Sequence, residues 1–441
     1  MAASDFQIGR TPLEKWIAGK IGVDPRQFTR QALADYQLAK INQTINLARD
    51  KSPFYKRKLA DFPGELTCLE DLQKLPFTSE RDLRRDGVRM LCVSQSDIQH
   101  VVTLDTSGTS GASKRCFFTA ADQELTRDFF GVGMSCLVQP ADKVLILLPG
   151  DRQGSVGDLL YDGLARQGIA SLKYGPVKNI SHVVKMIRQE KVTALVGSPT
   201  QILALARWSA FMGMPIPSSV GKVLLSTDNA ANSIVESIKQ QWNCEVFIHY
   251  GMTEMGLGGG VDCQAHHGLH LREADFLFEI IDPLSGLTLP DGATGEVVFS
   301  TLTRDGMPLI RYRTNDISRF NPDPCPCGTL LKTMDWVRFR YQSGVKFADQ
   351  MVNISDFDEV LFSIPEVLDF KVLLNAKKKE ITFNVFVIPD SLDGKTIGES
   401  LFSLKPMFNA RRSGEFHLKI NIINGLPDSF GSLAKRGIEF L

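Results

Sequence analysis

Three short apolar segments, KVLILLP (143–149), VTALVGSP (192–199) and GKVLLST (221–227), decide the fold class of this chain. Each has the length of a buried strand and is rich in Val and Leu. Apolar residues recur at helical intervals in four further stretches, at 157–167, 179–190, 200–212 and 230–242. Short buried strands that alternate with helices predict α/β units around a mainly parallel sheet.

The pattern changes on both sides of this region. The segment at 30–50 has helical spacing, whereas FLFEIID (276–282) and GEVVFSTL (295–302) alternate with a period of two residues. That alternation predicts antiparallel strands, which we expect to end near Phe320. The chain is too long for one ordinary core, so we expect a large N-terminal domain over 1–334 and a small C-terminal domain over 335–441.

The last hundred residues predict a small α+β lid domain. Ser355 precedes a helical run, with Asp358 placed to complete a weak capping box. FKVLL and ITFNVFVI flank the polar segment NAKKKE (375–380), which indicates a hairpin. A helix over roughly 394–412 then leads into the alternating segment HLKINII, so the unit has two helices and three strands by this interpretation.

Composition excludes several classes of function. The 441 residues include 50 Lys and Arg against 50 Asp and Glu, so nothing in the charge predicts a nucleic acid or an anionic membrane as partner. The N-terminal segment has no apolar run of a signal peptide, and no stretch approaches the ~20 apolar residues of a membrane span. We therefore expect a cytoplasmic protein, and whether it forms a homodimer stays open.

The loop TLDTSGTSGASKR (103–115) is the first segment that indicates chemistry. It follows an apolar strand, and its glycines and hydroxyl groups can surround phosphates with donors. It is not a Walker loop, because Lys114 follows Ser113 and not a glycine. Taken alone, a flexible surface loop explains the segment equally well.

Two later segments favour nucleotide binding. In FIHYGMTE (247–254) a strand ends in an aromatic ring, a tight turn, a hydroxyl and a carboxylate. Tyr250 could stack on adenine, Thr253 could contact a phosphate, and Glu254 could hold Mg²⁺, which prefers oxygen ligands. In RYRTND (311–316), the carboxylate of Asp316 could accept hydrogen bonds from ribose hydroxyls.

In this order the three segments resemble those of the adenylate-forming superfamily, which includes acyl-CoA synthetases, luciferases and peptide-synthetase adenylation domains. Within it, the chain is similar to the phenylacetate–CoA ligase branch, from SPFYKRKL (52–59) and LEDLQKLPFTSERDLR (69–84) to the long segment at 268–316. The segment 250–254 matches the family's Tyr-Gly-x-Thr-Glu text in full. The phosphate loop departs from it, because Ser113-Lys114-Arg115 stands where the family usually has Pro-Lys-Gly.

The resemblance implies a two-step reaction in which a carboxylic acid attacks ATP, pyrophosphate leaves, and CoA thiol then displaces AMP. It implies Mg²⁺ on Glu254, a hinge at Asp335 about which the lid rotates, and an adenylation lysine for which Lys435 is the candidate. Glu254, Lys435 and Thr253 are the expected catalytic residues. The expected ATP-binding residues are Thr106, Ser107, Gly108, Thr109, Ser110, Gly111, Lys114, Asp228, Tyr250, Gly251, Met252 and Asp316.

The acid pocket and the acceptor are less well defined. We assign the pocket to Gly157, Asp158, Tyr161, Ser226 and His249, and expect an aromatic acid. Asp158 either caps its helix or meets an amino or hydroxyl group of the acid. Two alternatives to CoA ligation remain. In the first, the enzyme passes the acyl group to an amine or a carrier, or uses ATP for other nitrogen chemistry. In the second, the chain is a nucleotide-binding relative without turnover.

The sequence also predicts a structural zinc ion. Cys325-Pro-Cys327-Gly328 is a knuckle with two thiols one residue apart, and upstream Cys263 is followed by His266, His267 and His270. Three cysteines and one histidine form a common closed zinc site. The branch resemblance favours His270, since Cys263…Gly268-Leu-His270 matches its text. A free turn with surface histidines is the alternative.

Overall fold

The computed structural model describes residues 9–62, 64–104, 113–337, 339–341, 344–347, 350–414, 416–428, 430–431 and 436–441. Its chain forms two compact units of similar size. The first comprises Met1–Leu137, Asp162–Gln167 and His249–Val337. The second comprises Val138–Tyr161, Gly168–Ile248 and Arg338–Leu441. The loop residues 106–111 and Lys435 lie outside the described residues.

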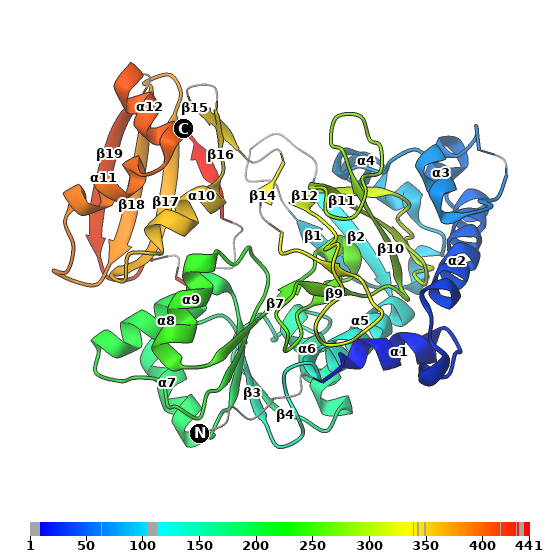
Figure 1. The fold of residues 1–441 in the computed structure, drawn as a ribbon, viewed down its shortest axis with the longest axis horizontal. Coiled ribbons are helices and arrows are strands. Elements are labelled where there is room, and N and C mark those ends of the chain that lie inside the picture. Colours follow the sequence, from blue (N-terminus) through cyan, green and yellow to red (C-terminus); the bar gives the residue numbers. More distant parts are fainter. Residues whose placement is uncertain are drawn as a thin grey trace. The chain divides into compact units, whose positions relative to one another are not determined.

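The second unit contains the predicted parallel sheet, in the order β4-β3-β5-β6-β7, with every neighbouring pair parallel. The apolar segments form β3, β5 and β6, which are buried along nearly their whole length because helices alternate with them in the chain (Figure 1). The strands are β3 (Lys143–Ile146), β4 (Ala170–Lys173), β5 (Ala194–Gly197), β6 (Lys222–Leu225) and β7 (Glu245–Tyr250). The helices are α6 (Val156–Arg166), α7 (Ile180–Gln189), α8 (Pro199–Phe211) and α9 (Asn232–Trp242). The α/β prediction is confirmed; only β4 was not predicted.

The first unit combines helices with antiparallel strands. The expected alternation after residue 275 forms antiparallel strands that pair in the order β10-β11-β12. The end of β7 continues into a small antiparallel group through β8, β9 and β13. The helices are α1 (Pro12–Lys20), α2 (Arg30–Lys51), α3 (Pro53–Lys58), α4 (Glu80–Asp86) and α5 (Ala120–Met134). The strands are β1 (Ile98–Leu104), β2 (Lys114–Thr119), β8 (Gly260–Val261), β9 (Leu269–Leu271), β10 (Phe276–Ile281), β11 (Gly295–Thr301), β12 (Tyr312–Ser318) and β13 (Thr333–Met334).

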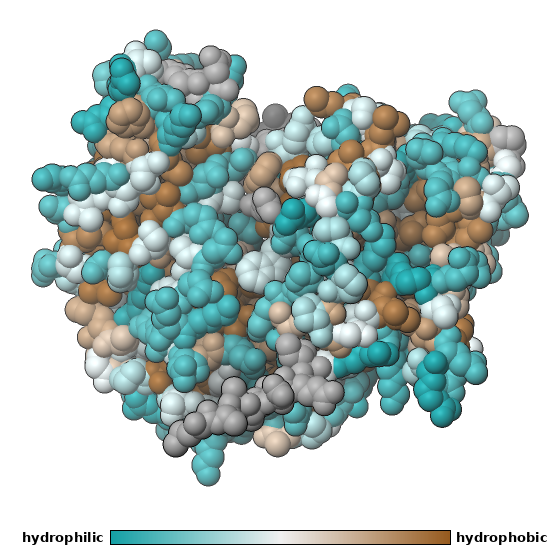
Figure 2. Space-filling view, viewed as in Figure 1, coloured by the Kyte–Doolittle hydropathy of each residue, from teal (hydrophilic) through white to brown (hydrophobic). Residues whose placement is uncertain are grey.

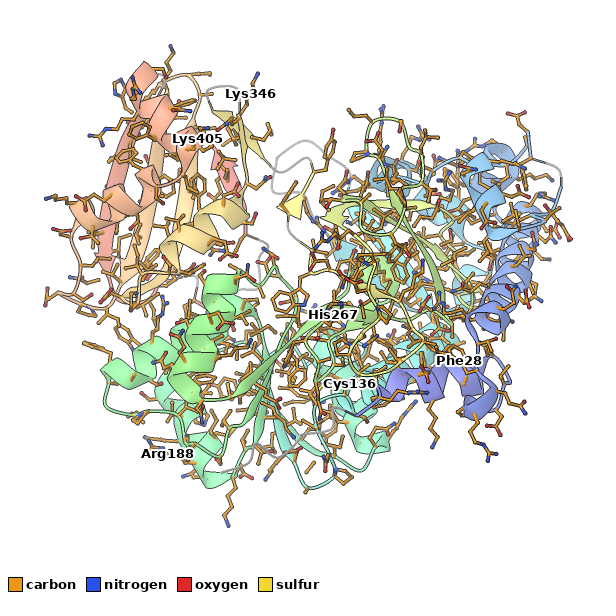
Figure 3. All side chains as sticks on the ribbon, in the orientation of Figure 1. Phe28, Cys136, Arg188, His267, Lys346 and Lys405 are labelled. Carbon is orange, nitrogen blue, oxygen red and sulfur yellow. The ribbon has the colours of Figure 1, made fainter. Side chains whose placement is uncertain are left out.

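The C-terminal part of the second unit is an α+β structure, but larger than the sequence predicted. Its sheet has four strands in the order β19-β18-β17-β20, and it carries three helices (Figure 1). The labelled Lys405 marks the start of α12, one of these helices (Figure 3). The elements are β14 (Phe339–Arg340), β15 (Val345–Phe347), β16 (Gln350–Val352), α10 (Ile354–Leu361), β17 (Val367–Asn375), β18 (Glu380–Val387), α11 (Gly394–Phe402), α12 (Lys405–Ser413), β19 (His417–Asn424) and β20 (Ile438–Phe440).

Two local predictions in this part were wrong. The capping box of α10 is formed by Asn353 and Asp356, not by Ser355 and Asp358, because the helix begins two residues earlier than its apolar pattern suggested. The single helix expected over 394–412 is broken into α11 and α12, since Pro406 occupies the first turn of a new helix. The predicted hairpin of β17 and β18 is confirmed.

Within the second unit, residues after 353 pack against α8 and α9. The carboxylate of Glu359 accepts hydrogen bonds from the backbone N–H groups of Asn232 (2.7 Å) and Ser233 (2.9 Å) in the first turn of α9. Arg207 of α8, itself buried, donates to the carbonyls of Phe362 (2.7 Å) and Ile364 (2.9 Å). The free N–H groups of one helix start are thus satisfied by a side chain over a hundred residues away.

The surface agrees with the balanced composition. Hydrophilic side chains cover much of the visible face, with hydrophobic residues between them (Figure 2). In the described part of the chain, every helix is too short or too polar to span a membrane.

Candidate functional site

A buried carboxylate forms the centre of the candidate site in the first unit. Glu254 lies in a short 3₁₀ turn, Thr253–Met255, directly after β7. Its Oε1 accepts a hydrogen bond from Nζ of Lys114 at 2.6 Å and from the hydroxyl of Tyr312 at 2.8 Å. All three residues are buried, and Lys114 and Tyr312 begin the strands β2 and β12. Residues from three distant segments therefore meet at one oxygen.

The charges of this cluster explain its ionisation. Burial alone would raise the pKa of Glu254, but the Lys114 ammonium and the Tyr312 hydroxyl together hold that pKa below its ordinary value. Burial and the neighbouring Glu254 carboxylate raise the pKa of Tyr312 well above its ordinary value. Lys114 also lies 3.6 Å from the carboxylate of Glu80 at the start of α4. Glu254 is therefore ionised and Tyr312 is a hydrogen-bond donor at neutral pH.

The segment around Glu254 also brings together Tyr250 and Asp316. The hydroxyl of Tyr250 donates to Oδ2 of Asp316 at 3.0 Å, and both side chains are buried. A Cβ at Gly251 would lie 2.0 Å from the carbonyl oxygen of Leu257, so the turn admits only glycine there. Met252 is buried and Thr253 is half-buried beside Glu254.

The residues assigned to the acid pocket occur in both units. In the first unit, His249 packs against the rings of Phe130 and Phe129, with centroids 5.8 and 6.4 Å away. Burial lowers the pKa of His249 to about 4, so the imidazole is neutral at pH 7.

In the second unit, Asp158 accepts hydrogen bonds from the backbone N–H of Gly154 (2.9 Å) and from Nζ of Lys173 (3.0 Å). Lys173 also lies over the ring of Tyr161. The carbonyls of Leu148 and Pro149 lie 2.7 Å from the place of a Cβ at Gly157.

Ser226 and Asp228 follow β6 in the second unit. Ser226 is buried and donates its backbone N–H to the carbonyl of Gly197. Asp228 accepts hydrogen bonds from its neighbour Asn229 (2.9 Å) and from the backbone N–H of Arg436 (3.4 Å). The roles of the pocket residues and of Asp228 stay predictions.

Three further sets of assigned residues have different outcomes. The phosphate loop (Thr106, Ser107, Gly108, Thr109, Ser110 and Gly111) and Lys435 lie outside the described residues. Asp335 forms an ion pair with Arg319 at 3.3 Å, two residues before the boundary at Val337. Tyr312 was not assigned by sequence reasoning, although it lies in the quoted segment RYRTND. The only available signal was its position on the strand that carries Asp316.

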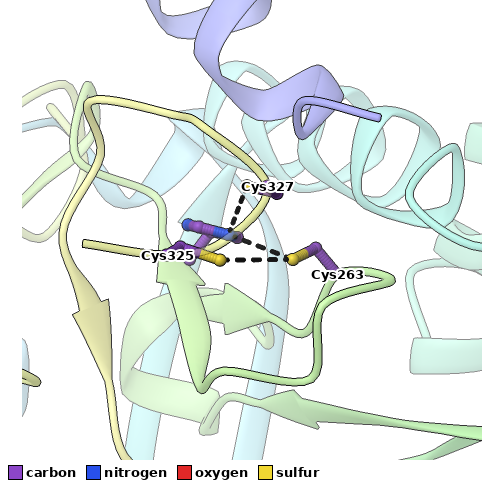
Figure 4. Close-up of side chains that lie close together, drawn as sticks. Cys263, Cys325 and Cys327 are labelled. Carbon is purple, nitrogen blue, oxygen red and sulfur yellow. Dashed lines mark hydrogen bonds between the residues drawn. The ribbon is translucent and has the colours of Figure 1, made fainter. Parts of the chain in front are cut away.

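A second buried cluster contains the four residues predicted to bind zinc. The ligand atoms of Cys263, His270, Cys325 and Cys327 all lie within 4.8 Å of one another (Figure 4). The two sulfurs of Cys263 and Cys325 are 3.7 Å apart, and Nε2 of His270 lies 3.3 Å from Cys263 and 3.6 Å from Cys327. All four residues are buried, and the three cysteines are free thiols.

The N-terminal helix α1 attaches to this cluster. Oε2 of Glu14 accepts hydrogen bonds from the hydroxyl of Thr329 (2.5 Å) and the backbone N–H of Leu330 (2.6 Å), just after the cysteine knuckle. Thr11 lies 3.5 Å from the sulfur of Cys136, which Figure 3 labels. The segment after the cysteine knuckle therefore holds helix α1 in place.

Comparison with known proteins gives matches along most of the chain. A family described as AMP-binding enzyme matches residues 70–303, which is more than half of the sequence. The phenylacetate–coenzyme A ligase of Pseudomonas putida is 29% identical over 304 residues, 66% of this chain and 67% of the relative. The enzyme of that name from Thermus thermophilus is 25% identical over 349 residues, 77% of either chain.

A solved structure has the same fold over nearly the whole chain. A 2-hydroxyisobutyryl-CoA ligase, in the postadenylation state in complex with R3-HIB-AMP, superposes with a TM-score of 0.76. The match covers 93% of this chain and 89% of the other, at 18% sequence identity. At that identity the likeness concerns the fold alone.

Proposed function

The chain belongs to the family of AMP-binding enzymes, in the phenylacetate–CoA ligase-like branch of the adenylate-forming superfamily, and on that premise we propose a complete reaction for it. It is an AMP-forming acid–CoA ligase. The carboxylate of an acid attacks the α-phosphorus of ATP, so that a carbon–oxygen–phosphorus anhydride forms and pyrophosphate leaves. The thiol of CoA then attacks the acyl carbon, and AMP leaves as the thioester forms.

The observation that carries this proposal is the meeting of Lys114, Glu254 and Tyr312. A phosphate site needs a cation to neutralise the oxygens and a carboxylate to hold a divalent metal ion. Lys114 and Glu254 supply these two groups within 2.6 Å of one another. Tyr250 and Asp316, hydrogen-bonded at 3.0 Å, supply a ring and a carboxylate for the nucleoside of ATP.

Mg²⁺ suits this donor set, because Glu254 is a buried carboxylate that stays ionised. When bound, the ion would neutralise charge on the phosphates as pyrophosphate leaves. Tyr312 orients the carboxylate by its hydrogen bond to Oε1, which leaves the second oxygen for the metal ion. Before ATP binds, the Lys114 ammonium balances the charge of the Glu254 carboxylate. Once ATP binds, the Lys114 side chain can turn to the phosphate oxygens and balance their charge instead.

The acid is an aromatic one in our proposal. The relatives from Pseudomonas putida and Thermus thermophilus are named for phenylacetate. The neutral His249, packed on Phe129 and Phe130, supports a pocket for an uncharged ring.

The second cluster supports a structural zinc ion. With Zn–S bonds of about 2.3 Å and Zn–N bonds of about 2.05 Å, a tetrahedral site places sulfurs about 3.8 Å apart and sulfur and nitrogen about 3.6 Å apart. The spacings of 3.7, 3.3 and 3.6 Å among Cys263, Cys325, Cys327 and His270 agree with those values. Four protein ligands leave no open position for substrate, so the role is structural.

Two assays in sequence test the proposed function. An acid panel is screened for acid-dependent exchange of radioactive pyrophosphate into ATP, and the best acid is then tested for CoA-dependent release of AMP. We expect exchange with an aromatic acid and AMP release that requires CoA. Exchange without CoA-dependent release would favour an amine or a carrier as acceptor. Binding of ATP without exchange for any acid would identify a relative without turnover.

A further inference from the structure

A buried arginine, Arg304, donates hydrogen bonds to the backbone of the two segments that carry Lys114 and Glu254. Arg304 lies just after β11 and is 6% exposed. Its Nη1 donates to the carbonyl oxygen of Glu254 at 2.8 Å, and its Nη2 donates to the carbonyl oxygen of Phe117, also at 2.8 Å. One planar guanidinium therefore bridges the turn that carries Glu254 and the strand β2.

The two hydrogen bonds of Arg304 affect the distance between the Lys114 ammonium and the Glu254 carboxylate. Phe117 is the third residue after Lys114 in β2, and Glu254 contributes both the carbonyl that Arg304 holds and the carboxylate that Lys114 contacts at 2.6 Å. The ammonium–carboxylate contact and the guanidinium–carbonyl contacts thus join the same two segments at two places. Because the guanidinium is rigid and each of its two terminal nitrogens holds one of the two segments, it fixes the distance between them.

The charge of Arg304 is not needed for an ion pair. Within the described residues, no carboxylate oxygen lies at ion-pair distance from its guanidinium, and its Nε is buried without a hydrogen-bond partner. The group lies over the ring of Phe118, 4.5 Å from the centroid. A buried cation is costly when no carboxylate balances it. A function that needs this guanidinium beside Glu254 would account for a buried, unbalanced cation at this position.

We propose that Arg304 is a positioning residue that sets the spacing of Lys114 and Glu254 for the phosphates and metal ion of ATP. It acts through the carbonyls of Glu254 and Phe117 and touches no reacting atom. The inference rests on the proposed function, because it assigns a residue to the same ATP site. It adds the requirement that the guanidinium shape, and not only a positive charge, is needed at this position.

The test compares Arg304→Ala and Arg304→Lys with a matched control. Arg49 of α2 also donates to two backbone carbonyls, those of Phe62 (3.0 Å) and Gly64 (3.1 Å), but contacts neither Lys114 nor Glu254. We expect the rate of pyrophosphate exchange to fall at least about tenfold in both Arg304 variants, which corresponds to ~1.4 kcal/mol of transition-state stabilisation. Arg49→Ala should keep the parent rate. Melting temperatures of all variants are measured in the same buffer.

Chemical rescue separates positioning from a merely structural role. Guanidinium ion at millimolar concentration, far below the molar concentrations that unfold proteins, can occupy the space left in Arg304→Ala. We expect it to restore part of the exchange rate of Arg304→Ala and to leave the parent and Arg49→Ala unchanged. If Arg304→Ala does not fold, the Arg304→Lys variant decides the question by its rate and by a raised requirement for Mg²⁺.

An unchanged exchange rate in folded Arg304→Ala or Arg304→Lys would overturn the inference. So would equal effects of guanidinium on Arg304→Ala and Arg49→Ala. Should the parent show no exchange with any acid, the proposed function fails separately. The Arg304 assignment is then judged by calorimetry of ATP binding with and without Mg²⁺. It stands only if Arg304→Lys weakens the Mg²⁺-dependent part of ATP binding and Arg49→Ala does not.

Discussion

At the scale of single residues, the two donors to Glu254 share one of its oxygens. Lys114 and Tyr312 both meet Oε1, at 2.6 and 2.8 Å, so a metal ion can approach the other oxygen without displacing Tyr312. The roles of the two donors therefore differ. In the proposed reaction, Lys114 balances the charge and leaves when phosphates bind, whereas Tyr312 orients the carboxylate throughout.

We predict that Glu254→Gln abolishes adenylation while weak nucleotide binding persists. The amide keeps the size of the side chain but removes the charge that would hold Mg²⁺ on the phosphates. Pyrophosphate exchange should fall at least about a thousandfold, a loss of ~4 kcal/mol in transition-state stabilisation. Glu245→Gln, at the exposed start of β7, is the control and should exchange at the parent rate. Equal exchange in Glu254→Gln and the parent would refute the metal assignment.

Tyr312→Phe should change the pH dependence of exchange. The Tyr312 hydroxyl is one of the groups that lower the pKa of Glu254 against the effect of burial, so its removal raises that pKa. Glu254 then takes up a proton at a higher pH as the solution is acidified. We expect exchange several-fold slower at neutral pH, with an acid limb displaced to higher pH. A pH profile of the same shape and position as that of the parent would show that Tyr312 does not act through Glu254.

At the scale of elements, sequence periodicity predicted the helices and strands whose positions depend on the local pattern of apolar residues. The helices α6 to α9 and the strands β3, β5 and β6 lie within a few residues of their predicted places, because each has a clear apolar repeat and a polar boundary. The errors occurred at helix ends, where Asn353 and Pro406 set boundaries that hydrophobic spacing does not encode.

Contacts between distant segments were harder to predict. The sequence indicated Lys114 and Glu254 as two separate features, and their ion pair joins residues 140 positions apart. Tyr312 and Arg304 were missed for the same reason, since their partners lie on other elements. The predicted zinc ligands are the exception, because cysteine is scarce enough for spacing and chemistry to select three of them, and the family resemblance selected His270.

The loops after β8 and β12 should depend on a metal ion. We predict about one zinc per chain by metal analysis of the purified protein. The double substitution Cys325→Ser and Cys327→Ser should lower the free energy of unfolding by at least about 4 kcal/mol, the range in which loss of a structural metal falls. Cys68→Ser, at an exposed thiol, serves as control. Acid preference should persist in any folded fraction, because the cluster has no open position.

A metal-free preparation of full stability would contradict the zinc assignment. A disulfide between Cys263 and Cys325 in the native protein would do so too, because their sulfurs are 3.7 Å apart and a bond would remove two ligands. Mass spectrometry of the alkylated protein, unfolded with and without reductant, distinguishes these cases.

At the scale of the whole molecule, the C-terminal segment has contacts that a lid must be able to release. Glu359 caps the start of α9, and Arg207 binds carbonyls after α10, all within the second unit. The Arg207 guanidinium is buried where it meets these carbonyls, and this burial lowers the pKa of Arg207 to about 10. If the domain after Asp335 rotates between the two half-reactions, these hydrogen bonds are made in one position and broken in the other. Each half-reaction should then depend on different residues of the segment after 335.

Lys435 provides the sharpest test of that division. We predict that Lys435→Ala slows pyrophosphate exchange at least about a hundredfold, a loss of ~2.7 kcal/mol in transition-state stabilisation, because the family resemblance gives this lysine a role in adenylation only. Formation of thioester from a supplied acyl-adenylate and CoA should stay within about twofold of the parent, well under 1 kcal/mol. Lys419→Ala, on strand β19, is the control for loss of a positive charge and should leave both rates unchanged. Stopped-flow measurement of the two half-reactions separates them. Equal losses in both would mean that Lys435 supports the structure of the domain, and loss of thioester formation alone would place it in the second step.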